Sequence, residues 1–110
     1  MTDLQLLVLL APAERRDDLV DVLMELAVTS GFTLTPALGF SREHSHFSLR
    51  EQVAGYRDVD RFEILAARAE LPAVLAALSA ACGNERLRYW IADIAGSGHL
   101  PQPGGEADEA

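Results

Sequence analysis

The chain of 110 residues contains no lysine, because all nine of its basic residues are arginine. This absence excludes chemistry centred on lysine, such as a Schiff base or the lysine of a P-loop. A single cysteine, Cys82, excludes an intrachain disulfide framework and a cysteine-based zinc cage. The N-terminal apolar stretch is too short for a signal sequence, and no run approaches the roughly 18 apolar residues of a membrane span. We therefore expect a soluble, cytoplasmic protein.

Positive charge is also scarce, with nine basic residues against 17 acidic ones and a formal net charge of −8. Such a balance provides no electrostatic footprint for nucleic acid or for an anionic membrane. The 49% hydrophobic content is that of a globular chain, and the length suits one domain. Glycine, proline and acidic residues dominate the C-terminal end. These features predict one domain over residues 1–98 and a disordered acidic tail over 99–110.

The first half of the chain shows a strand, a helix and a second strand. Residues 4–10 are almost continuously apolar, which is typical of a buried strand. Pro12 then suits the first turn of a helix, and apolar residues recur at helical spacing as far as Ala27. The Ser30-Gly31 pair ends this helix. The pattern then changes to a period of two over residues 32–40, where Pro36 indicates an edge strand or a bulge.

The second half repeats this order of strand, helix and strand. Residues 57–68 alternate as a strand, and a helix follows with Pro72 near its first turn. Gly83-Asn84 ends the helix, and residues 87–95 form the last strand. In this strand we expect Tyr89-Trp90 to place one ring in the core and the other in a subunit interface.

The resulting order, β-α-β-β-α-β, predicts an α+β, ferredoxin-like fold, in which two helices cover one face of a four-stranded antiparallel sheet. The first strand is apolar on both faces. Leu4, Leu6, Val8 and Leu10 point one way, whereas Leu7 and Leu9 point the other way. We expect Leu7 and Leu9 to lie on the face without helices and to be covered by another subunit, which predicts a homo-oligomer.

The chain resembles the PII signalling superfamily over roughly residues 3 to 100. The more specific segments are Ser30-Gly31-Phe32-Thr33, Leu49-x-Glu51-Gln52-Val53-x-Gly55 and Tyr89-Trp90. They are similar to a small PII-like group that is encoded near heavy-metal efflux systems and is related to CutA. The resemblance implies a homotrimer, and it implies a component of a heavy-metal efflux membrane transporter as partner.

One departure from the PII pattern limits what the resemblance implies. PII proteins that bind ATP carry a Thr-Gly-x-x-Gly-Asp-Gly-Lys turn before the last strand, whereas this chain has Cys82-Gly83-Asn84-Glu85-Arg86. The sequence therefore has no nucleotide motif. Uridylylation is not implied either, because Tyr56 lies at the far end of the long connection rather than near its tip.

The connection over residues 41–55 is long for a compact domain, which indicates either a functional loop or a floppy insertion. It contains His44 and His46, whose alternate spacing lets both imidazoles reach one ion from an extended backbone, with Glu43 supplying an oxygen. Such ligands suit a zinc or copper ion. The alternative interpretation is that these are ordinary surface histidines. His99 is a poorer candidate and is expected to be exposed.

Arg57, Arg86 and Arg88 are candidates for clamping an anionic ligand in a cleft between subunits. The more frequent role of such arginines is an ion pair with acids on a neighbouring strand or subunit. Arg61 has the same two interpretations. Cys82 follows the apolar stripe of its helix, so we expect a buried thiol rather than a thiolate.

These observations favour a PII-like regulatory protein that senses a divalent or heavy metal through its long loop and modulates a metal-efflux partner. Two alternatives stay open. The chain could bind a nucleotide or another anion at the arginines, or it could be an adaptor that binds only protein. No nucleophile elbow, suggestive Ser/His/Asp order or glycine-rich phosphate cradle is present, so we do not expect an enzyme.

Overall fold

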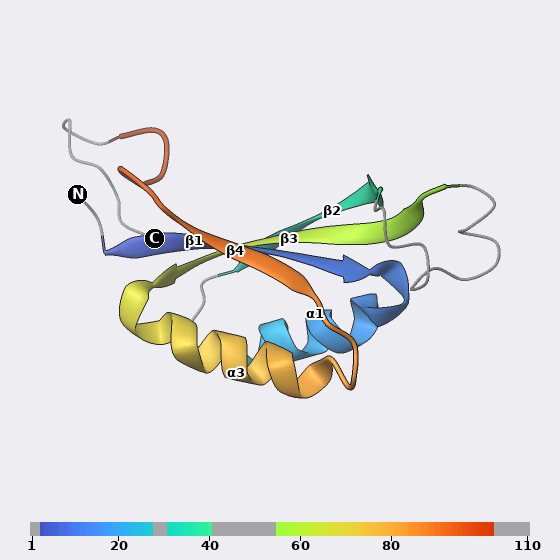
Figure 1. Ribbon diagram of the computed structural model, residues 1–110. Coiled ribbons are helices and arrows are strands. Elements are labelled where there is room, and N and C mark those ends of the chain that lie inside the picture. Colours follow the sequence, from blue (N-terminus) through green and yellow to red (C-terminus); the bar gives the residue numbers. More distant parts are fainter. Residues whose placement is uncertain (1–2, 28–30, 41–54, 103–110) are drawn as a thin grey trace.

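The computed structural model describes residues 3–27, 31–40 and 55–102. Its strands and helices are β1 (Leu4–Pro12), α1 (Arg16–Glu25), β2 (Phe32–Gly39), β3 (Arg57–Ala67), α3 (Leu71–Ala81) and β4 (Arg88–Asp93). Short 3-10 turns at Ala13–Arg15 and Arg68–Glu70 lead into the two α-helices. The strands pair antiparallel in the order β2-β3-β1-β4. Both α-helices lie on one face of this sheet, and none of the residues that the structure describes forms a helix on the other face (Figure 1). The predicted ferredoxin-like fold is confirmed.

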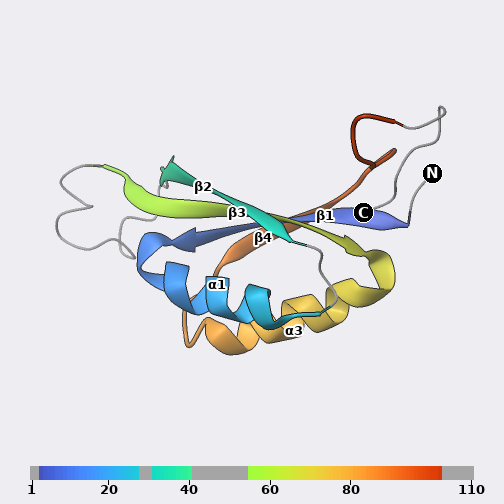
Figure 2. The same cartoon turned by 180° about the vertical axis from the view of Figure 1, so that it is seen from behind.

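The core lies between the sheet and the two α-helices, which form a layer below the sheet in the view from behind (Figure 2). Its largest fully buried side chains come from β1, β3, α1 and α3, and burying each of them stabilises the fold by about 1.5–3 kcal/mol. These core side chains are Leu7, Leu19, Leu23, Phe62, Ile64 and Val74.

The two faces of β1 are the reverse of the sequence-based expectation. Leu7 and Leu9 are 0% and 4% exposed and belong to the core beneath the helices. Since side chains alternate along a strand, Leu6 and Val8 lie on the open face instead. The expectation failed because both faces of β1 are apolar, so that alternation alone gives no indication of which one meets the helices. An apolar set does face away from the helices, but it is the even-numbered one.

The connection from β1 into α1 also differs from the prediction. Pro12 is the last residue of β1, where it lies opposite Val59, and not part of the first turn of the helix. Its φ of −57° and ψ of 142° are extended, and the 3-10 turn separates it from Arg16. At the other end, α1 stops at Glu25 rather than continuing towards Ser30-Gly31, because Leu26 is extended.

β2 and β4 are the two edges of the sheet, so Pro36 lies on an edge strand, as its missing N–H requires. The pairing with β3 runs without interruption, so there is no bulge at Pro36. Phe32 and Leu34 pack against the core, whereas Leu38 and Phe40 are 55% and 73% exposed. The end of β2 rises away from the helix layer, which explains this exposure (Figure 2).

The aromatic residues of β4 also differ from the prediction, because β4 is an edge strand. Tyr89 and Trp90 are 50% and 38% exposed, so neither ring is in the core. Trp90 lies opposite Val8 on the open face, and Tyr89 lies opposite Leu9 on the helix face. A strand with only one neighbour leaves its side chains open along the other side, which the residue pattern alone did not indicate.

The second helix begins and ends close to the predicted positions. Pro72 is in the first turn of α3, and Gly83 follows Cys82, the C-cap, with a φ of +64°. This left-handed backbone at a helix end is why glycine stands there. None of the helices in the described part of the chain is long and apolar enough to span a membrane. Residues 94–102 form neither helix nor strand, and residues 103–110 of the expected tail lie outside the described residues.

Candidate functional site

The segment 41–54 leaves and re-enters the fold at one paired point at the end of the sheet. Gly39, the last residue of β2, lies opposite Arg57, the first residue of β3. Beyond this pair, the rings of Phe40 and Tyr56 pack against each other with centroids 5.9 Å apart. Gly55 has a φ of +81°, a conformation that favours glycine, just before the chain enters β3. The base of the segment is therefore fixed by backbone pairing and by an aromatic contact.

The predicted metal ligands Glu43, His44 and His46 lie outside the described residues, and the prediction is not tested by the structure. Within the ranges that the structure describes, no group of three or more His, Cys, Asp or Glu side chains is placed to hold a metal ion. His99 is described, and it is exposed.

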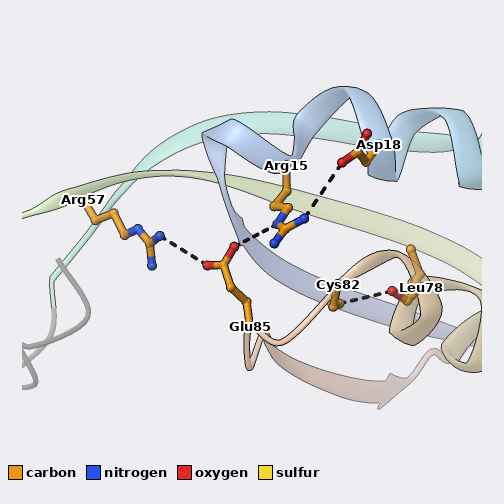
Figure 3. Close-up of polar contacts among 6 residues, drawn as sticks. All are labelled: Arg15, Asp18, Arg57, Leu78, Cys82 and Glu85. Carbon is orange, nitrogen blue, oxygen red and sulfur yellow. Dashed lines mark hydrogen bonds and ion pairs between the residues drawn. The ribbon is translucent and has the colours of Figure 1, made fainter. Parts of the chain in front are cut away.

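Beside this base, a carboxylate is held between two arginines from different parts of the chain (Figure 3). Arg15 in the 3-10 turn donates from Nε to Glu85 Oε1 at 2.8 Å. Arg57 at the start of β3 donates from Nη2 to Glu85 Oε2 at 3.3 Å. Glu85 itself lies in the turn between α3 and β4. The Arg15–Glu85–Arg57 triad thus joins two connections and the start of β3 at one end of the sheet.

The electrostatics of the triad favour the charged forms. The hydrogen bond from Arg15, together with the positive charges of Arg15 and Arg57, holds the pKa of the Glu85 carboxyl below its usual value. The same hydrogen bond raises the pKa of the Arg15 guanidinium. Asp18 adds a weaker contact, with its Oδ2 at 4.0 Å from Arg15 Nη1. The three side chains of the triad are between 23% and 34% exposed, so water still reaches them.

A second ion pair anchors the start of α1 to the sheet. Arg16 donates from Nε and Nη2 to the two oxygens of Asp60, at 2.8 and 2.6 Å. The side chain of Asp60 is 0% exposed, whereas that of Arg16 is 45% exposed. A buried carboxylate needs such a bidentate partner, so this pair fixes Arg16 and its neighbour Arg15 in position.

The three arginines proposed to clamp an anion between subunits lie in β3, in the turn before β4 and in β4, and a single chain does not test that cleft. Arg57 belongs to the triad, whereas Arg88 lies in β4 opposite Leu10, and Arg86 is exposed in the preceding turn. The alternate spacing of Arg86 and Arg88 does not place them on one strand, because β4 begins at Arg88. Within the part of the chain that the structure describes, Arg57 forms an ion pair with Glu85, which is the second interpretation given for these arginines.

On the open face, the guanidinium carbon of Arg61 lies above the Trp90 ring, 5.5 Å from its centroid. Arg61 Nη2 also lies 3.8 Å from Glu63 Oε2. This arrangement combines a cation–π contact with an exposed ion pair. Arg61 therefore belongs to the open face of the sheet and not to the triad.

Cys82 is partly buried, and its thiol donates to the carbonyl of Leu78 at 3.1 Å. Burial raises the pKa of the Cys82 thiol, which agrees with the expectation of a thiol rather than a thiolate. Such a cysteine completes the end of α3 and carries no reactive charge.

Sequence reasoning missed Arg15 and Glu85. The signal was available in the fold order, because the connections after the first and before the last strand meet at the same end of a ferredoxin-like sheet. An arginine from one connection and the glutamate of the other were therefore candidates for pairing. Their distance of 70 positions along the chain hid this relation.

Comparison with known proteins identifies the family. Residues 1–101 match the family model described as protein of unknown function (DUF3240). A crystal structure of a DUF3240 family protein from Shewanella baltica OS155 is 42% identical, with a TM-score of 0.77, and the match covers 91% of this chain and 99% of that one. No curated protein matches the chain.

A second similar structure is that of Arabidopsis thaliana PII bound to citrate. It has a TM-score of 0.71 at 10% identity, and the match covers 100% of this chain and 94% of that one. At this identity the likeness shows the fold alone, and it agrees with the PII-like resemblance of the sequence. The chain belongs to the DUF3240 family, and its fold is similar to that of Arabidopsis thaliana PII.

Proposed function

We propose that this protein is a non-enzymatic, PII-like regulator that binds a divalent or heavy metal ion through Glu43, His44 and His46 and thereby modulates a protein partner. The observation that supports this proposal most directly is the fixed base of the segment 41–54, closed by Gly39, Arg57 and the Phe40–Tyr56 contact. Because the ends are already held together, an ion that gathers the two histidines does not have to offset the entropy of loop closure.

The proposed mechanism is a shift between two states of the segment. Imidazole and carboxylate ligands from residues 43–46 bind zinc or copper, and the metal-bound conformation presents a different surface to the partner. The ion shifts the equilibrium only by the difference in its affinity for the two states. The resemblance to the PII-like group encoded near efflux systems, which is related to CutA, supports a membrane transporter component for heavy-metal efflux as that partner.

The regulator would act as a homotrimer in the cytoplasm. The open face of the sheet carries apolar side chains from β1 and β3, together with Arg61, Glu63 and Trp90. An apolar face without helices favours coverage by further copies of the chain. The PII-like fold supports three copies as the number.

Calorimetric titration of Zn²⁺ and Cu²⁺ tests the metal site. We expect the untagged protein to bind with micromolar or tighter affinity, and the His44→Ala/His46→Ala variant to lose that binding. The matched control is His99→Ala, which removes an exposed histidine outside the segment and should leave binding unchanged. Equal heat from the wild type and the double variant would contradict the proposal.

A second candidate function, anion binding, is supported by the triad. Arg15 and Arg57 converge on one carboxylate, that of Glu85, and this geometry supports binding of an external oxyanion. The similar Arabidopsis thaliana protein is described as bound to citrate, another anion. Melting temperatures measured with phosphate, citrate or ATP, against divalent metals, separate the two candidates, because a ligand that prefers the folded state raises the midpoint. No shift with either class would favour an adaptor that binds only protein.

A further inference from the structure

The Arg15–Glu85–Arg57 triad has the geometry of an anion site that already holds an internal anion. Glu85 does not form the two parallel bonds of a bidentate pair with one guanidinium. Instead, each of its oxygens accepts from a different arginine, at 2.8 and 3.3 Å. The carboxylate therefore bridges two cations that come from separate elements, the turn before α1 and the first residue of β3.

Arg15 has hydrogen-bonding capacity beyond this contact. A guanidinium carries five N–H donors, and among the described residues Arg15 donates a single hydrogen bond, from Nε. Its Nη2 rests against the turn, since a Cβ placed on Gly83 would lie 3.2 Å from that nitrogen. An oxyanion with three or more oxygens could take a bidentate contact from Arg15 and a further contact from Arg57, with a separate oxygen for each bond.

The position of the Glu85 side chain would also allow it to move away from the two arginines. It lies in the turn between α3 and β4, outside any helix or strand, and its side chain is 34% exposed. Its backbone is held to the turn by a long hydrogen bond of 3.3 Å to the carbonyl of Cys82. Rotation of the side chain into solvent would expose both arginines at the cost of two partly exposed ion pairs, which is small.

We propose that Glu85 is a tethered competitor for an oxyanion site formed by Arg15 and Arg57, and that a ligand with a phosphate or polycarboxylate group must displace it to bind. This inference rests on anion binding, the second candidate function, and adds its regulation. A tethered carboxylate acts as a ligand at high effective concentration. Anions with low affinity for the two arginines, such as weak monoanions, therefore do not displace it. Because Glu85 is part of the chain, a single substitution removes the competitor and leaves both arginines in place.

The test is the affinity for inorganic phosphate and for citrate, measured by calorimetry at matched ionic strength in the wild type, Glu85→Gln and Glu85→Ala. We expect both variants to bind about three- to tenfold more tightly than the wild type, as the loss of two competing surface ion pairs implies. Adding Arg15→Ala to Glu85→Gln should abolish the gain. ATP, titrated alongside, distinguishes a phosphate group on a larger molecule from the free anion.

The matched control is Glu63→Gln, which removes a partly exposed carboxylate from the ion pair with Arg61 on the open face and should not change anion affinity. Circular dichroism and melting temperature establish that each variant is folded. Equal affinity in the wild type and both Glu85 variants, lost on Arg15→Ala, would overturn the competitor role and leave the anion site intact. No saturable binding in any Glu85 variant would overturn the anion site as well.

Discussion

At the scale of residues, the fold assigns acidic partners to arginines at both ends of the sheet. Arg16 holds the fully buried Asp60, whereas Arg68 pairs in exposed positions with Asp93 at 3.0 Å. The energetic weight of these pairs differs, because a buried carboxylate that loses its partner stays desolvated, and an exposed one returns to water. Burial therefore decides which substitution matters.

Replacing Arg16 with alanine is expected to destabilise the protein by roughly 2–3 kcal/mol, since it leaves the buried Asp60 carboxylate without its charged donor. Urea unfolding gives this value directly. The control is Arg68→Ala, whose side chain is 61% exposed and whose loss should cost less than about 1 kcal/mol. Equal losses for the two variants would contradict the structural role of the Arg16–Asp60 pair.

The low pKa of Glu85 gives a second prediction at this scale. A carboxyl whose pKa is lower in the folded state stabilises the fold above its ordinary pKa of about 4.3, and that contribution is lost as the pH falls through the folded value. The groups facing it are Arg15 and Arg57, which lower its pKa, with Asp18 and Cys82 beside Arg15.

Glu85→Gln should therefore cost up to about 1 kcal/mol near neutral pH, and this difference from the wild type should shrink as the pH falls below about 4. Chemical unfolding of both proteins between pH 3 and pH 7 provides the measurement, because this range spans the ordinary pKa of a glutamate carboxyl. A difference that is independent of pH would show that the charge of Glu85 does not contribute.

At the scale of elements, the end of α3 determines how the triad is assembled. Gly83 adopts a left-handed conformation at the helix end, and the guanidinium of Arg15 lies against it. The same glycine thus ends the helix, turns the chain towards β4 and leaves room for the arginine. A side chain at this position would both strain the backbone and displace the guanidinium of Arg15.

Gly83→Ala is expected to destabilise the protein by about 1–2 kcal/mol, because alanine is strained at a φ of +64° and its Cβ would lie 3.2 Å from Arg15 Nη2. The control is Gly96→Ala, where an added Cβ meets nothing within 4 Å. Thermal melts of both variants give the comparison. A neutral Gly83→Ala would mean that the turn has another conformation.

The order and type of these elements could be predicted from the sequence, because hydrophobic periods and the glycine and proline positions are local signals. Pro36 on an edge strand and Gly83 after α3 are examples. The face of the sheet on which Leu7 lies and the exposure of Tyr89 could not be predicted, since they depend on which strands are neighbours and where the helices lie. Arg15 and Glu85 were missed for the same reason, as their contact joins distant parts of the chain.

At the scale of the whole molecule, α1 and α3 cover one face of the sheet, and no helix of the described residues covers the other face (Figure 1). Leu6 and Leu65 lie opposite each other on the open face, and Val8 and Trp90 form the next such pair. We propose that further copies of the chain cover this face, as the homotrimer requires. The even-numbered residues of β1 would then form the centre of the interface.

Trp90→Asp should convert the proposed trimer into a folded monomer, because it places a charge on the open face at a partly exposed position. The control is Tyr89→Asp, one residue away on the helix face of the same strand and 50% exposed, which should leave the assembly unchanged. Sedimentation velocity measures the masses, with 11.9 kDa expected for one chain. A monomeric wild type would contradict the trimer.

The central claim, that the segment 41–54 responds to a metal ion, is tested most directly by amide hydrogen exchange of that segment with and without Zn²⁺. We expect slower exchange with Zn²⁺ in residues 41–54 of the wild type, while the His44→Ala/His46→Ala variant shows no change. Exchange in the described strands should be the same in both proteins. Identical exchange with and without the ion in the wild type, or equal protection in the double variant, would contradict metal sensing by this segment.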